Sequence, residues 1–253
     1  MNTPLFTKFS SAIRNFGGVV DAPALQLAAS GSLAAYYAPF DAINPQAKVV
    51  LVGITPGRTQ ASNALAEACK QLANGASHED ALSRAKRVGA FSGAMRTNLT
   101  ALLDHIGLPR WLSLASCDEL FGNAAHLLQS ASVLPFPVFV NGGNYNGTPN
   151  PLSTPMLRQM VLEHFVPMAH ALPEAVFVPL GPVPTRVLQW LVSQNHLSGR
   201  QLLLGLPHPS GANAERIHYF LGKKEAANLS SKTDPVKLDA ARNQLQKGVA
   251  LLY

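Results

Sequence analysis

The sequence predicts an α/β fold, a three-layer α/β/α sandwich around a central, mostly parallel four-stranded sheet. Four short segments are continuous runs rich in Val and Leu and bounded by Gly or Pro, which is typical of strands buried on both faces. Segments with apolar residues at helical spacing separate them, and this alternation indicates a parallel sheet covered by helices. Apolar residues make up 47% of the 253 residues and charged residues only 13%, enough for a large core.

The expected elements follow in chain order. The expected strands are Val49–Ile54, Pro137–Val140, Ala175–Leu180 and Gln201–Leu206. The expected helices are Ala61–Leu72, Met95–Ile106, Pro155–Ala171 and Pro184–Val192, the last opening with Pro in its first turn. No linker divides the strands, so we expect a single domain over residues 1–253. About residues 1–45 should form N-terminal helical packing, and about residues 234–253 a C-terminal helix.

Composition argues against several classes of protein. No apolar run approaches the roughly 20 residues that cross a bilayer, and the first residues lack the basic-then-apolar order of a secretory signal. We therefore expect a cytoplasmic protein that does not contact a membrane. Two cysteines are too few for a disulfide framework, a four-thiolate zinc site or an iron–sulfur cluster, and we expect no metal and no cofactor. A net charge of +6 suits a polyanionic partner, although many basic proteins never bind nucleic acid.

Four turns are expected along one edge of the sheet. The carboxyl ends of parallel strands share the edge where ligands bind, and this places there "GITPG" (53–57), "NGGNYNG" (141–147), "GPVP" (181–184) and "HPSG" (208–211). In the first turn, Gly53 and Gly57 permit close approach to the backbone and Pro56 removes one donor, so the following helix N-terminus favours an anion or a carbonyl oxygen. An ordinary strand-to-helix turn is the alternative, because the Lys of a phosphate-cradling loop is absent.

Further side chains suit a flat heterocycle. His208 can donate a hydrogen bond near neutral pH, and Ser210 can cap a following helix. Phe91, in a Gly-flanked turn, offers a stacking face. Asn141 offers the donor and the acceptor needed to read an amide edge such as that of uracil. Taken singly, each of these residues is more commonly structural.

The order of these motifs resembles the uracil-DNA glycosylase superfamily. Between Lys48 and Tyr219 the chain carries a G-x-x-P-G turn, a Phe in a Gly-rich turn, a strand-end Asn and a late H-P-S. "GITPG" is similar to the first motif of the mismatch-specific and single-strand-selective branches. "VGAFSGAMRTNLTALLDHIGL" is similar to a helix of the thermophile branch, and "HPSGAN" to the last motif across the superfamily. The resemblance covers most of the chain and implies a glycosylase-like fold.

The resemblance also implies roles for individual residues. Members of this superfamily flip a nucleotide out of the stack and cleave the bond between base and sugar. Phe91 would then stack on the base, Asn141 would hydrogen-bond its polar edge, and His208 would donate to O2 of the departing base. Framing of the pocket and positioning of water would come from Gly53, Ile54, Thr55, Pro56 and Gly57. Contacts to the DNA backbone would come from Ser210, Arg58, Arg96 and Arg216.

Two departures from the family pattern predict a weak enzyme. Thr55 stands where the active branches have Asp or Asn, and Thr can neither stabilise an oxocarbenium-like sugar nor act as a base near pH 7. Small residues, Gly211 to Ala214, replace the bulky wedge after the H-P-S. Single-stranded DNA is therefore expected as partner in preference to duplex, and a free base or nucleotide stays open. For the cations of Arg84–Arg87, a solvated helix face is as good an explanation as backbone contact.

The leading hypothesis is a DNA base-excision glycosylase acting on uracil or a related deaminated base, with His208 carrying most of the catalysis and Thr55 holding a water. The alternative is a non-catalytic protein of the same fold that binds a base, a nucleotide or a DNA lesion. A third hypothesis is a small-molecule hydrolase using Ser210 and His208, although no acid is identifiable and no G-x-S-x-G elbow exists. A carboxylate in the pocket, from Glu67 or Asp104, would strengthen the case for an enzyme.

Overall fold

The computed structural model describes residues 4–90 and 93–252. By their contacts these residues form two compact units, each assembled from segments that are separate in the sequence. Unit 1 comprises Met1–Ile43, Gly53–Ala90 and Ala131–Ala171, and unit 2 comprises Asn44–Val52, Phe91–Ser130 and Leu172–Tyr253. Neither unit is contiguous along the chain, and the expectation of a single domain stays a prediction.

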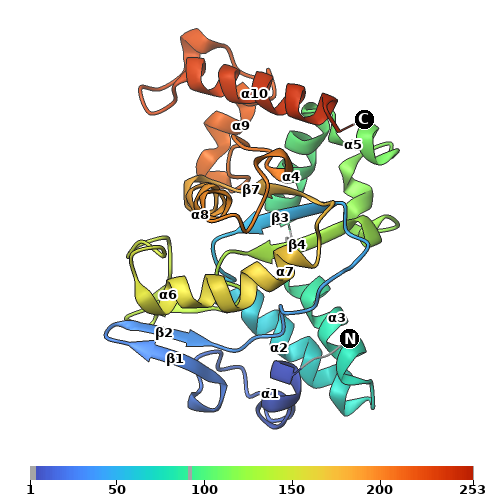
Figure 1. The fold of residues 1–253 in the computed structure, drawn as a ribbon, viewed down its shortest axis with the longest axis vertical. Helices are drawn as coiled ribbons and strands as arrows, with labels where there is room; N and C mark the ends of the chain where they lie inside the picture. The colour runs from blue at the N-terminus through green and yellow to red at the C-terminus, as the bar shows by residue number, and fades with distance from the viewer. Residues whose placement is uncertain (1–3, 91–92, 253) are drawn as a thin grey trace. The chain divides into compact units, whose positions relative to one another are not determined.

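Unit 1 combines helices with an antiparallel sheet in the order β1-β2-β5-β6 (Figure 1). Its strands are β1 (Gln26–Ser30), β2 (Leu33–Tyr36), β5 (Val138–Val140) and β6 (Gly143–Asn144). Its helices are α1 (Pro4–Arg14), α2 (Arg58–Ala73), α3 (His78–Gly89), α6 (Pro155–Met160) and α7 (Val166–His170). The expectation of purely helical packing over residues 1–45 is wrong, because a turn at Gly31, with φ of 57°, pairs β1 with β2 as a hairpin.

A chain of aromatic rings forms much of the interior of unit 1. Phe9 from α1 stacks on Tyr37 with ring centroids 4.7 Å apart, and Tyr37 lies 5.5 Å from Phe136. The edge of His164 meets Phe136 at 5.0 Å. His164 lies in the π-helical turn Val161–Phe165, where the amide of Val166 donates to the carbonyl of Val161. Pro167 follows this turn and has no amide hydrogen, so the helix is locally rewound rather than ended.

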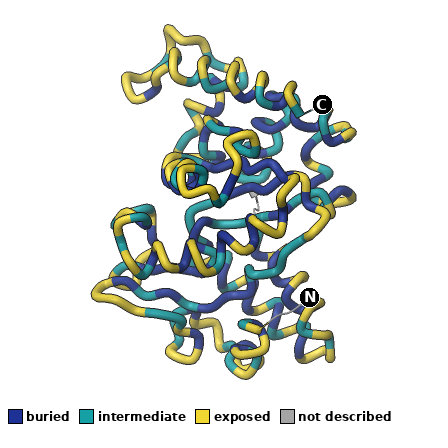
Figure 2. The backbone as a smooth tube through the Cα atoms, in the orientation of Figure 1, coloured by how far each residue is buried: buried dark blue, intermediate teal, exposed yellow. Residues whose placement is uncertain are grey.

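Unit 2 is built on three parallel strands in the order β4-β3-β7, with β3 at Val49–Gly53, β4 at Leu128–Ser132 and β7 at Val176–Pro179. Its helices are α4 (Gly93–His105), α5 (Leu108–Leu112), α8 (Pro182–Ser193), α9 (Ala214–Phe220) and α10 (Pro235–Ala250). β7 is buried throughout and β3 up to Val52 (Figure 2). Alternate residues of these strands pack against apolar side chains of α4, α9 and α10. Burial on both faces explains why these two strands read as continuous apolar runs.

The α/β class is confirmed, but the single four-stranded parallel sheet is wrong. Pro137–Val140 belongs to the antiparallel sheet, because Asn141 (φ 48°) and Gly142 (φ 77°) form a two-residue turn that brings β6 back along β5. Gln201–Leu206 makes one parallel bridge, from Leu202 to Phe177, before the backbone departs at Gly205 (φ 107°). The third parallel strand is instead β4.

The predicted helices are confirmed with small shifts at their ends. Ala61–Leu72 lies within α2, Pro184–Val192 lies within α8, and Met95–Ile106 coincides with α4 to within two residues. Pro155–Ala171 becomes α6, the π-helical turn and α7. The C-terminal helix is α10, where the Asp234 carboxylate caps the amide of Lys237 at 3.1 Å. Across residues 4–90 and 93–252 no helix has the length and apolarity needed to cross a bilayer.

Candidate functional site

The residues predicted from the motifs are divided between the two units. Unit 1 holds Gly53, Ile54, Thr55, Pro56, Gly57, Arg58 and Asn141, and unit 2 holds Arg96, His208, Ser210 and Arg216. Phe91, the predicted stacking residue, lies outside the described residues. The chemistry of each group is therefore described within its own unit.

The turn after β3 is fastened to the segment that precedes β5. The carbonyl of Gly53 accepts from the amide of Val133 at 3.0 Å, and that of Ile54 from Leu134 at 2.9 Å. The Thr55 hydroxyl donates to the carbonyl of Phe136 at 2.8 Å and accepts from the amide of Val138 at 3.2 Å. A hydroxyl has one hydrogen, so Thr55 donates no further hydrogen bond in this state. This geometry gives Thr55 a structural role at the start of β5.

The N-terminus of α2 is capped from within the protein. The amide of Gly57 donates to Oε1 of Gln60 at 3.1 Å, and the amide of Arg58 donates to Oδ1 of Asn144 at 3.0 Å. Two of the donors that could have held an anion are therefore already satisfied.

Arg58 is held by neighbours on several sides. Its guanidinium bonds both carboxylate oxygens of Asp21, at 2.8 and 3.0 Å, and also donates to the carbonyl of Gly142 at 2.9 Å. It lies 4.3 Å from the centroid of the Phe139 ring. The hydrogen bonds from Arg58 lower the pKa of Asp21, which keeps that carboxylate charged. Arg58 therefore ties the loop before β1 to the β5–β6 hairpin, which accounts for it without a phosphate.

Asn141 is the first residue of the β5–β6 turn. Asn adopts the left-handed conformation more readily than most residues, and its amide N–H donates to the carbonyl of Ser32 at 2.9 Å. Its side chain is exposed and makes no hydrogen bond to any residue in the described parts of the chain. The side-chain amide is thus available to an external partner, although the backbone geometry alone already explains an Asn here.

His208 is a half-buried imidazole with a defined tautomer. The backbone amide of Ser210 donates to its Nδ1 at 3.2 Å. Since this amide can only donate, Nδ1 is unprotonated and a neutral ring carries its hydrogen on Nε2. Desolvation lowers the pKa of His208, which favours the neutral form near pH 7. The ring lies over Gly181, where an added Cβ would come within 3.4 Å of Cδ2, and the φ of 92° at this position favours glycine.

Two asparagines that are not among the predicted site residues hold the His208 loop. Nδ2 of Asn98, on α4, donates to the carbonyl of Pro209 at 2.9 Å, and Nδ2 of Asn213 donates to the Ser210 hydroxyl at 3.1 Å. An Asn inside a helix has poor propensity, and this was the available signal for Asn98. The Ser210 hydroxyl is not bonded to the imidazole, so the pair lacks the nucleophile–base contact of a hydrolase.

The remaining predicted cations of unit 2 have internal partners. The Arg96 guanidinium lies 4.9 Å from the centroid of the Phe121 ring. Arg216 donates through Nη1 to Oδ1 of Asn213 at 3.0 Å and through Nη2 to the carbonyl of Lys232 at 3.1 Å. Arg216 is nonetheless exposed, so contact with a phosphate stays a prediction.

The two carboxylates considered as additional catalytic groups are both engaged elsewhere. Asp104 accepts from the Ser116 hydroxyl at 2.8 Å and from the Cys117 amide at 2.7 Å. Glu67 accepts from Nε2 of Gln71 at 2.7 Å. Neither geometry marks a general base. In the described residues there is also no group of three or more His, Cys, Asp or Glu side chains able to hold a metal ion.

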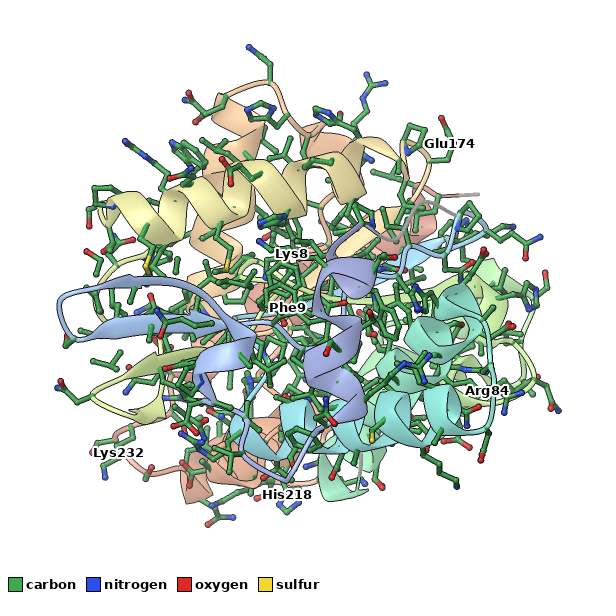
Figure 3. The ribbon with its side chains drawn as sticks, turned by 90° about the horizontal axis from the view of Figure 1, so that it is seen from below. Lys8, Phe9, Arg84, Glu174, His218 and Lys232 are labelled. Carbon is green, nitrogen blue, oxygen red and sulfur yellow. The ribbon has the colours of Figure 1, made fainter. Side chains whose placement is uncertain are left out.

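The basic run on α3 does not form one solvated face. Arg84 projects outward (Figure 3), whereas Lys86 is buried and its Nζ donates to the carbonyl of Ala42. Desolvation lowers the pKa of Lys86 to about 7. Lys86 therefore anchors the segment after β2, and its interpretation as a surface cation is wrong.

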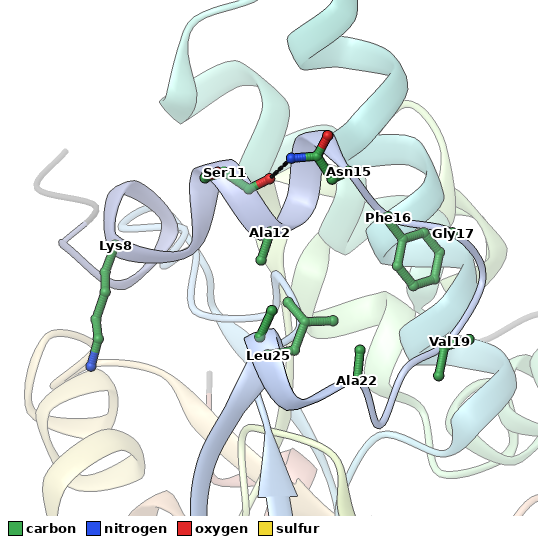
Figure 4. A pocket seen from close by; sticks show the side chains of 10 residues that line it. Lys8, Ser11, Ala12, Asn15, Phe16, Gly17, Val19, Ala22 and Leu25 are labelled. Carbon is green, nitrogen blue, oxygen red and sulfur yellow. Dashed lines mark hydrogen bonds between the residues drawn. The ribbon is translucent and has the colours of Figure 1, made fainter.

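A surface groove of about 550 Å³ lies in unit 1 between α1 and the segment leading to β1 (Figure 4). Apolar side chains such as Ala12, Phe16 and Leu25 line most of it, and Lys8 lies at one end. None of the residues predicted from the motifs lines this groove.

Comparison with known proteins yields one relative of comparable length. The chain is 37% identical over 196 residues to a Bacillus subtilis (strain 168) protein described as "Uncharacterized protein YoxB", an alignment covering 76% of this chain and 77% of the relative. No protein-family model matches the sequence. No solved structure matches it either.

Proposed function

The chain belongs to the same family as YoxB, and we propose that it is a uracil-DNA-glycosylase-like enzyme. In this proposal it cleaves the N-glycosidic bond of uracil or a related deaminated base in DNA, slowly. The observation that carries the proposal is His208, a neutral imidazole whose Nδ1 accepts from the Ser210 amide and whose Nε2–H is left as a donor.

The chemistry asked of His208 is stabilisation of the leaving group. When the bond between C1′ and the base nitrogen breaks, its electron pair stays on the base, and negative charge develops at O2. A water molecule then bonds to C1′ through its oxygen and gives up a proton to solvent, and the departed base anion takes up a proton from solvent. An Nε2–H donor aimed at O2 would stabilise this charge without reorganising, an effect worth about 3 kcal/mol, or roughly 10²-fold in rate.

Phe91 and Asn141 keep their expected parts in this proposal. Phe91 would stack on the flipped base and Asn141 would bond its polar edge, and the exposed amide of Asn141 supports the second role. Single-stranded DNA is the proposed partner in preference to duplex, because an unpaired base costs less to unstack. Slow turnover follows from Thr55, whose only hydroxyl hydrogen is donated to Phe136.

The test is release of the base from defined single strands. Labelled oligonucleotides carrying one uracil, hypoxanthine or xanthine are incubated with excess protein, and abasic sites are then cleaved with alkali. Strand breaks are expected with the wild type and with His218→Ala, which alters an exposed histidine of the same unit. His208→Ala should be about 100-fold slower. Breaks no faster than those of His208→Ala for all three bases would reject the proposal.

A second candidate is a protein that binds a base, a nucleotide or a DNA lesion without cleavage. The engagement of Thr55, Asp104 and Glu67 in other hydrogen bonds favours it. Fluorescence anisotropy should then show tighter binding to lesion-containing than to undamaged strands, and loss of that preference in Asn141→Ala and Phe91→Ala. Equal affinity for both strands would argue against lesion recognition.

A further inference from the structure

A chain of hydrogen bonds leads away from His208 along the start of α9. The Ser210 amide donates to Nδ1 of His208 at 3.2 Å. The Ser210 hydroxyl accepts from Nδ2 of Asn213 at 3.1 Å, and Oδ1 of Asn213 accepts from Nη1 of Arg216 at 3.0 Å. All four residues belong to unit 2. Each residue donates to the next one, from the Arg216 guanidinium through Asn213 and Ser210 to the His208 imidazole.

The direction of each bond is set by the groups themselves. A guanidinium can only donate, so Asn213 has to turn its carbonyl oxygen towards Arg216 and its amide nitrogen towards Ser210. Ser210 is then held on its hydroxyl, and its backbone amide points at Nδ1 of His208. A ring that accepts at Nδ1 keeps its hydrogen on Nε2, which is the atom available to a ligand.

The far end of this chain is fixed to the loop between α9 and α10. Nη2 of Arg216 donates to the carbonyl of Lys232 at 3.1 Å, and Lys232 lies at the periphery of the view in Figure 3. The preceding residue, Glu215, accepts hydrogen bonds from the same loop: from Lys224 Nζ at 2.8 Å, Ser230 Oγ at 2.6 Å and Thr233 Oγ1 at 2.5 Å. Adjacent residues of α9 therefore clamp the loop, and Arg216 is oriented by a fixed backbone carbonyl.

We propose that Asn213 and Arg216 are positioning residues that hold His208 in its Nε2–H tautomer, and that the loop between α9 and α10 is the support from which they do so. The catalytic consequence rests on the function proposed above, but the tautomer does not. Arg216 acquires a role other than the DNA-backbone contact expected from the sequence. Asn213, one of the small residues at the wedge position, acquires a positioning role instead.

The experiment is nitrogen-15 NMR of the histidine side chains at pH 7.5 in the full chain. The His208 signal is assigned by its loss in His208→Ala. Wild-type His208 should show one unprotonated and one protonated nitrogen, with Nδ1 the unprotonated one. In Asn213→Ala and Arg216→Ala the two shifts should move towards each other, because the tautomers exchange. Arg216→Lys, which keeps a cationic donor, should give intermediate shifts.

Arg200→Ala is the matched control, since Arg200 is exposed in the same unit and its side chain has no partner within the described residues. The proposal would be overturned if the His208 nitrogen shifts in Asn213→Ala, Arg216→Ala and Arg216→Lys all equalled those of wild type. If Asn213→Ala does not fold, Arg216→Lys supplies the same measurement. In the base-release assay the variants should lose about tenfold in kcat with KM unchanged. A wild type that releases no base overturns the proposed function alone, because the tautomer is measured without turnover.

Discussion

Replacing Thr55 by Val separates a structural role from a catalytic one. Valine keeps the β-branched shape and removes only the hydroxyl. That hydroxyl donates to the carbonyl of Phe136 at 2.8 Å and accepts from the amide of Val138 at 3.2 Å. Phe136 and Val138 are both fully buried, whereas Thr55 itself is part-buried, so water has limited access to the two groups that lose their partner.

The cost follows from two buried backbone groups left without a hydrogen bond. Each such group costs about 1–3 kcal/mol, and the turn is only part-buried at Thr55, so the lower half of that range applies. We expect Thr55→Val to lower the free energy of unfolding by about 3 kcal/mol, which for a chain of this size lowers Tm by roughly 6–12 °C.

Thermal and urea unfolding followed by circular dichroism measure this change. Thr55→Ser keeps the hydroxyl and is the matched control, with an expected loss of about 1 kcal/mol for the missing methyl group. Base release per folded molecule should be similar in the two variants. A Thr55→Val protein as stable as wild type but without base release would refute the reasoning, because the hydroxyl would then serve the chemistry rather than the fold.

Three other predictions concern unit 1. Arg58→Lys should lower the free energy of unfolding in urea by about 1–2 kcal/mol, since a lysine cannot bond both oxygens of Asp21; unchanged stability would contradict this. Between pH 7 and about 10, Lys86 holds a proton in the unfolded chain but has released it in the folded chain. The free energy of unfolding should therefore rise with pH over this range, and Lys86→Met should abolish the rise. An equal rise in wild type and Lys86→Met would contradict this. Gly89→Ala should cost about 1–3 kcal/mol, because the new methyl would lie 2.7 Å from Cε1 of Phe40; unchanged thermal stability would show that Phe40 moves aside.

The elements that the sequence predicted well are those whose own residues decide their structure. β3 and β7 are buried runs of Val, Leu and Phe, and no other pattern in the chain is as unambiguous. Helices α2, α8 and α10 show helical spacing together with Pro or a capping residue at their start. Local pattern and tertiary burial agree in these segments.

The strand pairing could not be predicted from apolar pattern alone. β4, with the sequence LQSAS, is not apolar, and its buried Gln129 is explained by a distant partner, the amide of Asn44 at 2.9 Å. β5 is apolar like β3, but the Asn141–Gly142 turn after it sends the chain back antiparallel. Asn-Gly is a recognisable hairpin signal, and the prediction that this segment lies at the carboxyl edge of a parallel sheet is wrong.

In the candidate site, the sequence indicates which residues are polar but does not indicate which groups they bond. Motif position singled out Thr55, Arg58 and Arg216 as site residues; Thr55 lies in the turn after β3, Arg58 begins α2 and Arg216 lies within α9. Three of their hydrogen-bond partners, Phe136, Asp21 and the carbonyl of Lys232, lie 81, 37 and 16 positions away in the sequence, and no local pattern reveals them. His208 is different, because its partner is the amide two residues later.

The hydrogen-bond partners of these residues limit the rate enhancement that the described residues can supply. With Thr55, Asp104 and Glu67 engaged in hydrogen bonds of their own, His208 is the described group that we propose to act on a leaving base. One preorganised donor supplies roughly 10²- to 10³-fold, far less than the 10⁶-fold or more typical of efficient enzymes. The proposed enzyme should therefore turn over slowly and lose almost all of that activity in His208→Ala, whereas the second proposal, base recognition without cleavage, expects no turnover in either protein. The ratio of base release between wild type and His208→Ala therefore separates the two candidates.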